Sequence, residues 1–236
     1  MIQFPIQQIN KKLEAYFPIN NIISIFGEFG VGKTTLCLQI IENLISKNQK
    51  IFYLYTKPKI PINRINDILN GKKNYADIDK LNLIKISKFE DLYDFVFKLE
   101  NLLLLEEKSK GITRNITKLL IIDSLTDLYK LELNSEKKER NVRLNYQLNQ
   151  ILATLTYLAR VYDITIIVVN ETSRKKIKDE FILFPSGGNV VDYWVRFSIL
   201  IKRFDKLNAR IFFLKIKDDN QEFQFTLNLT KRGFFK

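Results

Sequence analysis

The segment with the clearest chemistry runs from Gly27 to Thr34 and matches the phosphate-binding pattern G-x-x-x-x-G-K-[ST]. In such a loop, backbone N–H groups and the N-terminus of the following helix hold the β-phosphate of a nucleoside triphosphate. Lys33 would reach the β- and γ-phosphates as the candidate catalytic cation, and the Thr34 hydroxyl would ligate Mg²⁺. The residues predicted to bind the nucleotide are Gly27, Glu28, Phe29, Gly30, Val31, Gly32, Lys33, Thr34 and Thr35.

A second element of the same chemistry is the run Leu119–Ser124, which reads LLIIDS. Four apolar residues followed by Asp123 predict a buried strand that carries a carboxylate at its C-terminal end. At that end Asp123 would hold the Mg²⁺ shell opposite Thr34. The alternative is an aspartate that only caps the end of the strand.

The elements that must position these residues alternate between strand and helix. Ile22–Phe26 is a short apolar run rich in β-branched residues, which is typical of a buried parallel strand, and Thr34–Leu44 has near-helical apolar spacing. The same patterns predict further strands at Ile51–Thr56, Asn82–Ile86, Leu119–Asp123 and Ile164–Asn170, and helices at Phe89–Leu105 and Arg140–Tyr162.

The C-terminal part alternates in the manner of strands over Trp194–Lys202, Ala209–Lys217 and Glu222–Leu229, which predicts an antiparallel extension. Two polar stretches, Glu106–Asn115 and Ser173–Gly188, are predicted to be loops. No linker divides the chain. We therefore expect one α/β domain over residues 1–236, with a mostly parallel, twisted sheet flanked by helices.

Composition excludes several kinds of chemistry. The 236 residues contain one cysteine and no histidine, so a disulfide framework, a zinc site and histidine acid–base catalysis are excluded. No apolar run approaches the length of a membrane span and the N-terminus lacks a signal-peptide pattern, so we expect a cytoplasmic protein without membrane contact. The net charge of +12 fits a nucleic-acid-binding surface. It fits a genome rich in A and T equally well, because the chain has 28 Lys against 10 Arg, together with 21 Asn.

Several blocks of the chain, in order, resemble the core of RecA/RadA-type recombinases, and most closely their short archaeal RadB-like branch. The matching blocks are residues 4–40, 119–129, 144–171, 184–203, 210–217 and 225–234. The resemblance implies a RecA-like P-loop NTPase core that binds ATP with Mg²⁺. It also implies DNA as a partner, preferably single-stranded and with low sequence specificity, and assistance to a RadA-type recombinase in homologous recombination and repair. We expect neither the N-terminal helical DNA-binding domain of RadA nor its Phe-x-x-Ala docking motif, which the chain lacks.

Two departures from the family pattern concern hydrolysis. Where recombinases carry a glutamate that activates the attacking water, this chain has Lys57, and a protonated lysine cannot accept a proton. The usual Asn-Gln after the strand at 164–170 is replaced by Asn170-Glu171, so Glu171 either weakens coupling to the DNA loop or supplies the missing carboxylate. The resemblance places Arg64 against the adenine. We therefore expect ATP binding with weak or absent hydrolysis.

Two basic clusters remain. Arg174, Lys175, Lys176 and Lys178 follow the strand at 164–170, where the resemblance implies a DNA-binding loop and where several backbone phosphates would be neutralised. The alternative is an ordinary solvated loop in a lysine-rich chain. Lys215 and Lys217 match a pair that, in related oligomers, reaches a neighbour's γ-phosphate, with an exposed strand face as the alternative.

Three other functions share the nucleotide motifs. The first is a KaiC-like regulatory ATPase of the archaellum motor, which DNA binding would distinguish. The second is a small-molecule kinase, although no arginine-bearing lid is evident. The third is an adaptor that binds ATP structurally and does not bind DNA.

Overall fold

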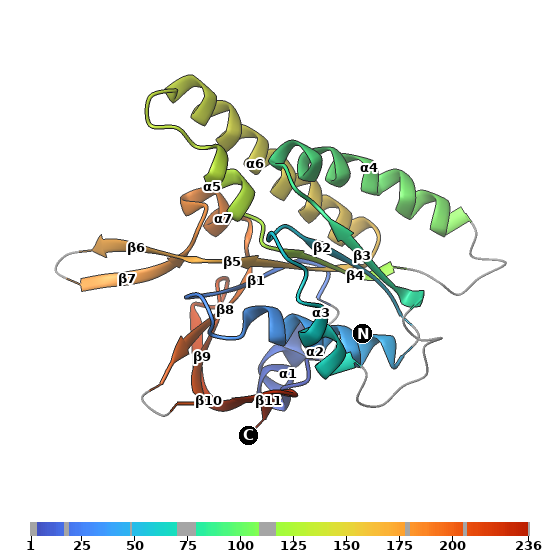
Figure 1. The fold of residues 1–236 in the computed structure, drawn as a ribbon, viewed down its shortest axis with the longest axis vertical. Helices are drawn as coiled ribbons and strands as arrows, with labels where there is room; N and C mark the ends of the chain where they lie inside the picture. The colour runs from blue at the N-terminus through green and yellow to red at the C-terminus, as the bar shows by residue number, and fades with distance from the viewer. Residues whose placement is uncertain are drawn as a thin grey trace.

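The computed structural model describes residues 4–16, 19–47, 49–69, 79–108, 117–177, 180–204 and 207–235, with side chains omitted for 175–177, 180 and 181. A nine-stranded sheet with the order β11-β10-β9-β8-β1-β5-β4-β2-β3 crosses the molecule (Figure 1). Its parallel strands are β1 (Ile22–Gly27), β2 (Lys50–Tyr55), β3 (Leu81–Lys85), β4 (Thr117–Asp123), β5 (Thr165–Asn170) and β8 (Phe197–Arg203). The antiparallel strands are β9 (Ala209–Ile216), β10 (Gln221–Thr230) and β11 (Gly233–Phe235).

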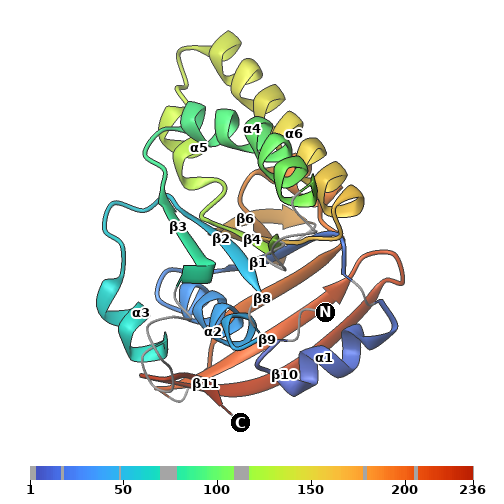
Figure 2. The ribbon, with the colours of Figure 1, turned by 90° about the vertical axis from the view of Figure 1, so that its right-hand side faces the viewer.

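Helices cover both faces of the parallel part of this sheet (Figures 1 and 2). One face carries α4 (Phe89–Lys108), α5 (Asp127–Glu132) and α6 (Lys138–Val161). The other face carries α2 (Lys33–Ile45) and α3 (Ile62–Leu69), and on this side the curled strands β9 to β11 pack with α1 (Gln7–Leu13) and a 3-10 turn at Glu14–Tyr16. The described residues contain no helix with the length and apolar character of a membrane span.

The two-sided cover explains why the central strands have apolar residues at consecutive positions. Every residue of β1 and β5 is buried, because alternate side chains enter two separate cores. Ile23 and Ile25 pack on the α2 side, whereas Ile22 faces the core of α4 and α6. The α/β fold predicted from the sequence, with its mostly parallel sheet and antiparallel extension, is therefore confirmed.

Strand register brings the predicted chemistry to one edge of the sheet. Phe26 is paired with Asn170, and Asp123 is paired with both Tyr55 and Val169. The C-terminal ends of β1, β2, β4 and β5 therefore meet, and the loops that leave them share one edge.

Several element boundaries differ from the expectation. Residues 173–177 and 180–185 of the expected loop are strands: β6 (Thr172–Ile177) and β7 (Glu180–Pro185) pair as an antiparallel hairpin, and α7 (Gly188–Trp194) follows. The hairpin projects away from the main sheet in Figure 1, so its charged residues need not enter a core. Glu106–Lys108 extends α4, and residues 109–115 of the other expected loop lie outside the described part.

The expected antiparallel extension begins one strand later than predicted. Trp194 belongs to α7, and β8 starts at Phe197 and runs parallel to β1. Antiparallel pairing starts only between β8 and β9. Alternation of apolar residues identifies a strand but carries no information about its direction.

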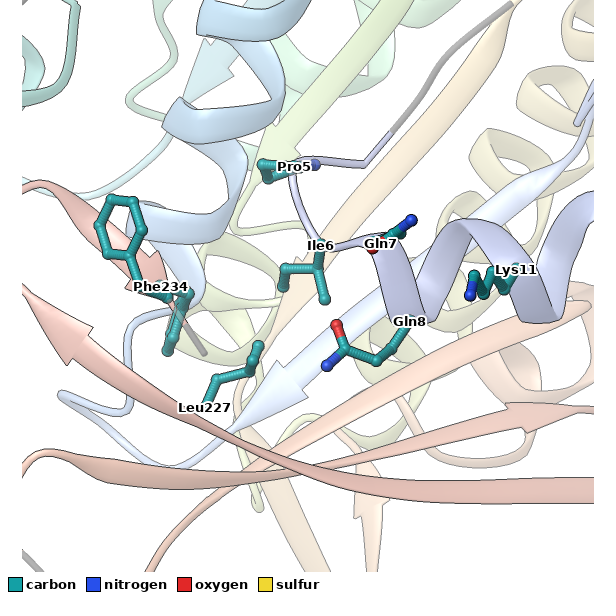
Figure 3. Close-up of a pocket in the computed structure, with 8 residues that line it drawn as sticks. Pro5, Ile6, Gln7, Gln8, Lys11, Leu227 and Phe234 are labelled. Carbon is teal, nitrogen blue, oxygen red and sulfur yellow. The ribbon is translucent and has the colours of Figure 1, made fainter.

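The segment that leads into α1 lies against the curled C-terminal strands. Figure 3 shows Ile6 beside Leu227 and Phe234 around a shallow cavity of about 320 Å³. The Phe234 ring is buried and packs edge-on against Phe212, with ring centroids 5.0 Å apart. The end of β11 is thus part of the core and not a peripheral appendage.

We expect Phe234→Ala to lower the free energy of unfolding by about 3–5 kcal/mol, because a large buried ring is replaced by a cavity. Urea denaturation measures this change. The neighbouring Phe235 is 50% exposed, so Phe235→Ala should cost less than about 1 kcal/mol. Equal effects of the two changes would contradict the assignment of Phe234 to the core.

Candidate nucleotide and magnesium site

The loop between β1 and α2 has the backbone shape that its glycines permit. Gly30 and Gly32 have φ values of +77° and +107°, in the left-handed region that disfavours other residues. A Cβ on Gly32 would also lie 2.6 Å from the Cζ atom of Phe234. The β11 strand therefore packs directly behind the loop, and α2 begins at Lys33.

Lys33 is folded into this loop, with only 4% of its side chain exposed. Its Nζ donates hydrogen bonds to the carbonyl oxygens of Gly27 (2.7 Å) and Glu28 (2.9 Å) and to Oε2 of Glu171 (3.0 Å). Burial lowers the pKa of Lys33, and the hydrogen bond and charge of Glu171 oppose that shift. The ammonium thus lies at the mouth of the loop, where phosphate oxygens would replace these acceptors.

Asp123 is fully buried at the end of β4. Its Oδ2 accepts hydrogen bonds from Thr34 Oγ1 at 2.6 Å and from the Tyr53 hydroxyl at 3.1 Å. Its Oδ1 is buried and has no hydrogen-bond partner among the described residues. A carboxylate oxygen without a hydrogen bond, beside a threonine hydroxyl, forms a set of oxygen ligands that suits Mg²⁺.

Tyr53 is a residue of this site that the sequence reasoning missed. Burial first, and then the charge of Asp123, raise the pKa of its hydroxyl well above the usual value, so the group remains a hydrogen-bond donor. Only the pairing of β2 with β4 places Tyr53 near Asp123, because the two residues lie on neighbouring strands. A single sequence does not reveal that neighbour relation.

Lys57 lies against both carboxylates of the site. Its Nζ is 3.5 Å from Oδ1 of Asp123 and 4.0 Å from Oε1 of Glu171. Burial alone would lower its pKa, but the charges of Asp123 and Glu171 outweigh it, so the pKa of Lys57 is raised. The structure therefore brings together four charged groups, Lys33, Lys57, Asp123 and Glu171.

Beside these charges lies a cavity of about 310 Å³. Its lining includes most of the predicted nucleotide-binding residues. The lining residues are Phe29, Gly30, Gly32, Lys33, Thr34, Thr35, Tyr55, Lys57, Pro61, Arg64, Glu171 and Leu229. The remaining predicted residues, Gly27, Glu28 and Val31, belong to the same loop but do not line the cavity.

Arg64 joins the cavity to the C-terminal strands. Its Nε and one terminal nitrogen donate to Thr35 Oγ1 at 3.2 and 3.0 Å, and its guanidinium also donates to the carbonyl oxygens of Thr230 (3.0 Å) and Lys231 (2.7 Å). The turn after β10 is thereby tied to the first turn of α2. The stacking of Arg64 on an adenine stays a prediction.

The basic hairpin starts directly beside this site. Arg174 is exposed on β6, and its guanidinium lies 3.4 Å from Oε1 of Glu28 in the phosphate-binding loop. Lys175 and Lys176 belong to β6 without described side chains, and Lys178 lies outside the described residues. The backbone carbonyl of Glu171, at the root of the hairpin, accepts hydrogen bonds from both the N–H and the Oγ of Ser186, each at 2.8 Å.

Lys215 and Lys217 lie away from the site. Lys215 is paired with Ser198 near the start of β8, at the edge of the sheet opposite the phosphate-binding loop. Nζ of Lys217 donates to the carbonyl oxygen of Asp192 at 2.6 Å, near the end of α7. Within one chain Lys217 therefore supports a helix C-terminus, and contact with a neighbour's phosphate stays a prediction.

The sheet order, the glycine loop and the buried Asp123 define a RecA-like P-loop protein. A family model described as Rad51 matches residues 1–233, so the chain belongs to the Rad51 family. The chain is also similar to proteins described as "DNA repair and recombination protein RadB". One, from Methanocaldococcus jannaschii, is 32% identical over 188 residues, 80% of this chain and 79% of that protein.

Two further relatives carry the same description. The protein from Methanococcus maripaludis strain C7 is 30% identical and covers 79% of this chain and 78% of its own length. The protein from Methanobrevibacter smithii is 26% identical over 227 residues, 95% of this chain and 92% of its own length. The resemblance to recombinases of the RadB branch, expected from the sequence, is confirmed.

We expect Lys33→Ala to weaken ATP binding by about 10–100-fold, because charged hydrogen bonds to the phosphates are lost. Isothermal titration with ATP and Mg²⁺ measures the Kd, and thermal unfolding of the apo variant confirms that it folds. The matched control is Lys98→Ala, on the exposed side of α4. Unchanged affinity in a folded Lys33→Ala protein would contradict the assignment of this loop to phosphates.

Proposed function

We propose that this chain is an ATP-binding and DNA-binding accessory protein of homologous recombination and DNA repair, which hydrolyses ATP weakly or not at all. Membership of the Rad51 family and similarity to RadB proteins support the recombination role. The observation that carries the finer proposal is the position of Lys57, whose ammonium lies between the carboxylates of Asp123 and Glu171. The protein acts as one RecA-like core domain.

ATP and Mg²⁺ would be held by the residues described above. The loop backbone from Gly30 to Thr34 and the Lys33 ammonium would bind the phosphates, while Thr34 and Asp123 would hold Mg²⁺. The metal, when bound, supplies positive charge to the β- and γ-phosphate oxygens. Leu229 and Arg64 form the wall of the cavity on the side of the C-terminal strands, where the adenine would lie.

Among the described residues that line the cavity, none offers a free carboxylate suited to activate water. Lys57 stays protonated because its pKa is raised, so it donates hydrogen bonds and accepts no proton. Glu171 is the remaining candidate base, but its carboxylate is engaged by Lys33 at 3.0 Å and faces Lys57. Without general-base assistance hydrolysis loses on the order of 10²–10⁴-fold in rate.

DNA would bind along the projecting hairpin. Arg174, Lys175 and Lys176 belong to β6, Lys178 follows them in the sequence, and Arg174 is exposed. Such a cluster binds phosphates of single-stranded DNA with little sequence preference. Arg174 also contacts Glu28, so the proposed DNA surface would adjoin the proposed nucleotide site. A RadA-type recombinase on the same DNA is the expected protein partner.

Binding to single-stranded DNA should depend steeply on salt. Neutralising four cations should lower the slope of log K against log salt by about 3, since each phosphate contact contributes about 0.7. The variant carries R174A, K175A, K176A and K178A, and the control carries K11A, K12A, K88A and K98A. Fluorescence anisotropy over a range of salt concentrations measures both slopes. The titrations are made without nucleotide, with ADP and with ATP.

A slope that falls equally in the variant and the control would show that total charge, and not the hairpin, binds DNA. Absence of DNA binding by the wild type at low salt would favour the ATP-binding adaptor instead.

Phosphate release from ATP should be slow and not stimulated by single-stranded DNA, because the attacking water lacks a base. We expect K57E, which places a carboxylate beside the phosphates, to raise single-turnover phosphate release at least about tenfold. Lys33→Ala provides the background rate. Brisk, DNA-stimulated release by the wild type would contradict the proposal.

A further inference from the structure

The buried carboxylate of Asp123 presents two differently occupied oxygens. Oδ2 accepts hydrogen bonds from Thr34 and Tyr53, whereas the buried Oδ1 accepts none from the part of the chain that the structure describes and faces Nζ of Lys57 at 3.5 Å. At this distance Lys57 and Asp123 form an ion pair but no close hydrogen bond. The cation at Oδ1 in the described structure is therefore an ammonium of the protein itself.

We propose that the Lys57 ammonium is a built-in substitute for part of the charge of the divalent cation, so that this chain binds ATP with little dependence on Mg²⁺. The inference rests on the proposed ATP site and concerns how that site neutralises its ligand. Lys57 would then contribute to ATP binding, in addition to being unable to act as a general base.

The charge count of the site supports this role. Lys33 and Lys57 together balance Asp123 and Glu171 before any ligand arrives. With a carboxylate at position 57, the site would hold three negative groups and one lysine. A tetra-anionic nucleotide would then need a divalent cation to enter, whereas the present site repels it much less.

Lys57 is held in place and is not a loosely anchored surface lysine. Its side chain is only 22% exposed and lines the same cavity as Lys33, Thr34 and Thr35. The preceding Thr56 is tied to β4: its N–H donates to the carbonyl of Asp123 at 2.8 Å, and its Oγ1 donates to that of Ser124 at 2.9 Å.

Two more contacts fix the backbone at this point. The N–H of Ser124 donates to Thr56 Oγ1 at 2.7 Å, and the ammonium of Lys85 donates to the carbonyl oxygen of Lys57. The residue is therefore built into the junction of β2 and β4. Because its position is fixed before the nucleotide binds, little conformational entropy is lost when the ammonium acts on the phosphates.

The test is the Kd for ATP, measured by isothermal titration with Mg²⁺ and again with EDTA. We expect the wild-type Kd to rise less than about tenfold on removal of Mg²⁺. In K57M the rise should reach about 100-fold, and in K57E it should be larger, since a unit charge near a phosphate changes affinity at least about tenfold at an effective dielectric constant near 20.

The matched control is K59M, because Lys59 is an exposed lysine two residues away that does not line the cavity. K59M should keep the wild-type ratio of the two Kd values. Circular dichroism and thermal unfolding show which variants fold, and the wild-type comparison needs no variant at all.

Two failures are distinguishable. If the wild type binds ATP with Mg²⁺ but loses more than about 100-fold in affinity with EDTA, or if K57M keeps the wild-type ratio, the inference about Lys57 is wrong and the ATP site stands. If the wild type binds ATP under neither condition, the proposed function itself fails.

Discussion

The buried carboxylate of Asp123 is the constraint on which the candidate nucleotide site depends. A charged group with no solvent exposure is stable only when hydrogen bonds and opposite charge replace its lost hydration. Three elements provide this replacement: Thr34 from α2, Tyr53 from β2 and Lys57 from the turn after β2. Moving any of these elements would leave an uncompensated charge, so the carboxylate fixes how the loop, β2 and β4 meet.

The C-terminal strands support the same site from the other side. Phe234 packs behind Gly32 so closely that a Cβ there would overlap its ring, and Arg64 ties the turn after β10 to Thr35. The glycine loop therefore has a rigid apolar backing formed by residues about 200 positions later in the chain. This arrangement explains why the antiparallel extension curls under α2, since its edge must reach the loop.

Local patterns were enough to predict the parts of the fold that depend on local chemistry. The glycine loop, the strand ending at Asp123 and the apolar central strands were found because each carries its own composition signal. The hairpin of β6 and β7 does not follow from the local pattern, because a strand pair without a buried face shows no alternation of apolar and charged residues. The direction of β8, the role of Tyr53 and the contact of Lys217 with Asp192 depend on neighbours distant in sequence, which one sequence does not reveal.

Glu171 connects the glycine loop with the hairpin of β6 and β7. Its carboxylate is held by Lys33 and faces Lys57, while its backbone carbonyl is held by Ser186 at the far end of the hairpin. A phosphate that takes the hydrogen bonds of Lys33 would leave Glu171 with Lys57 as its cationic neighbour. With glutamine at this position the side chain would carry no charge, so little electrostatic energy would be lost when Lys33 turned to the phosphate. With glutamate, the two lysines and the two carboxylates must be rearranged together, so Lys57 and Glu171 are best understood as a compensating pair in one charge balance.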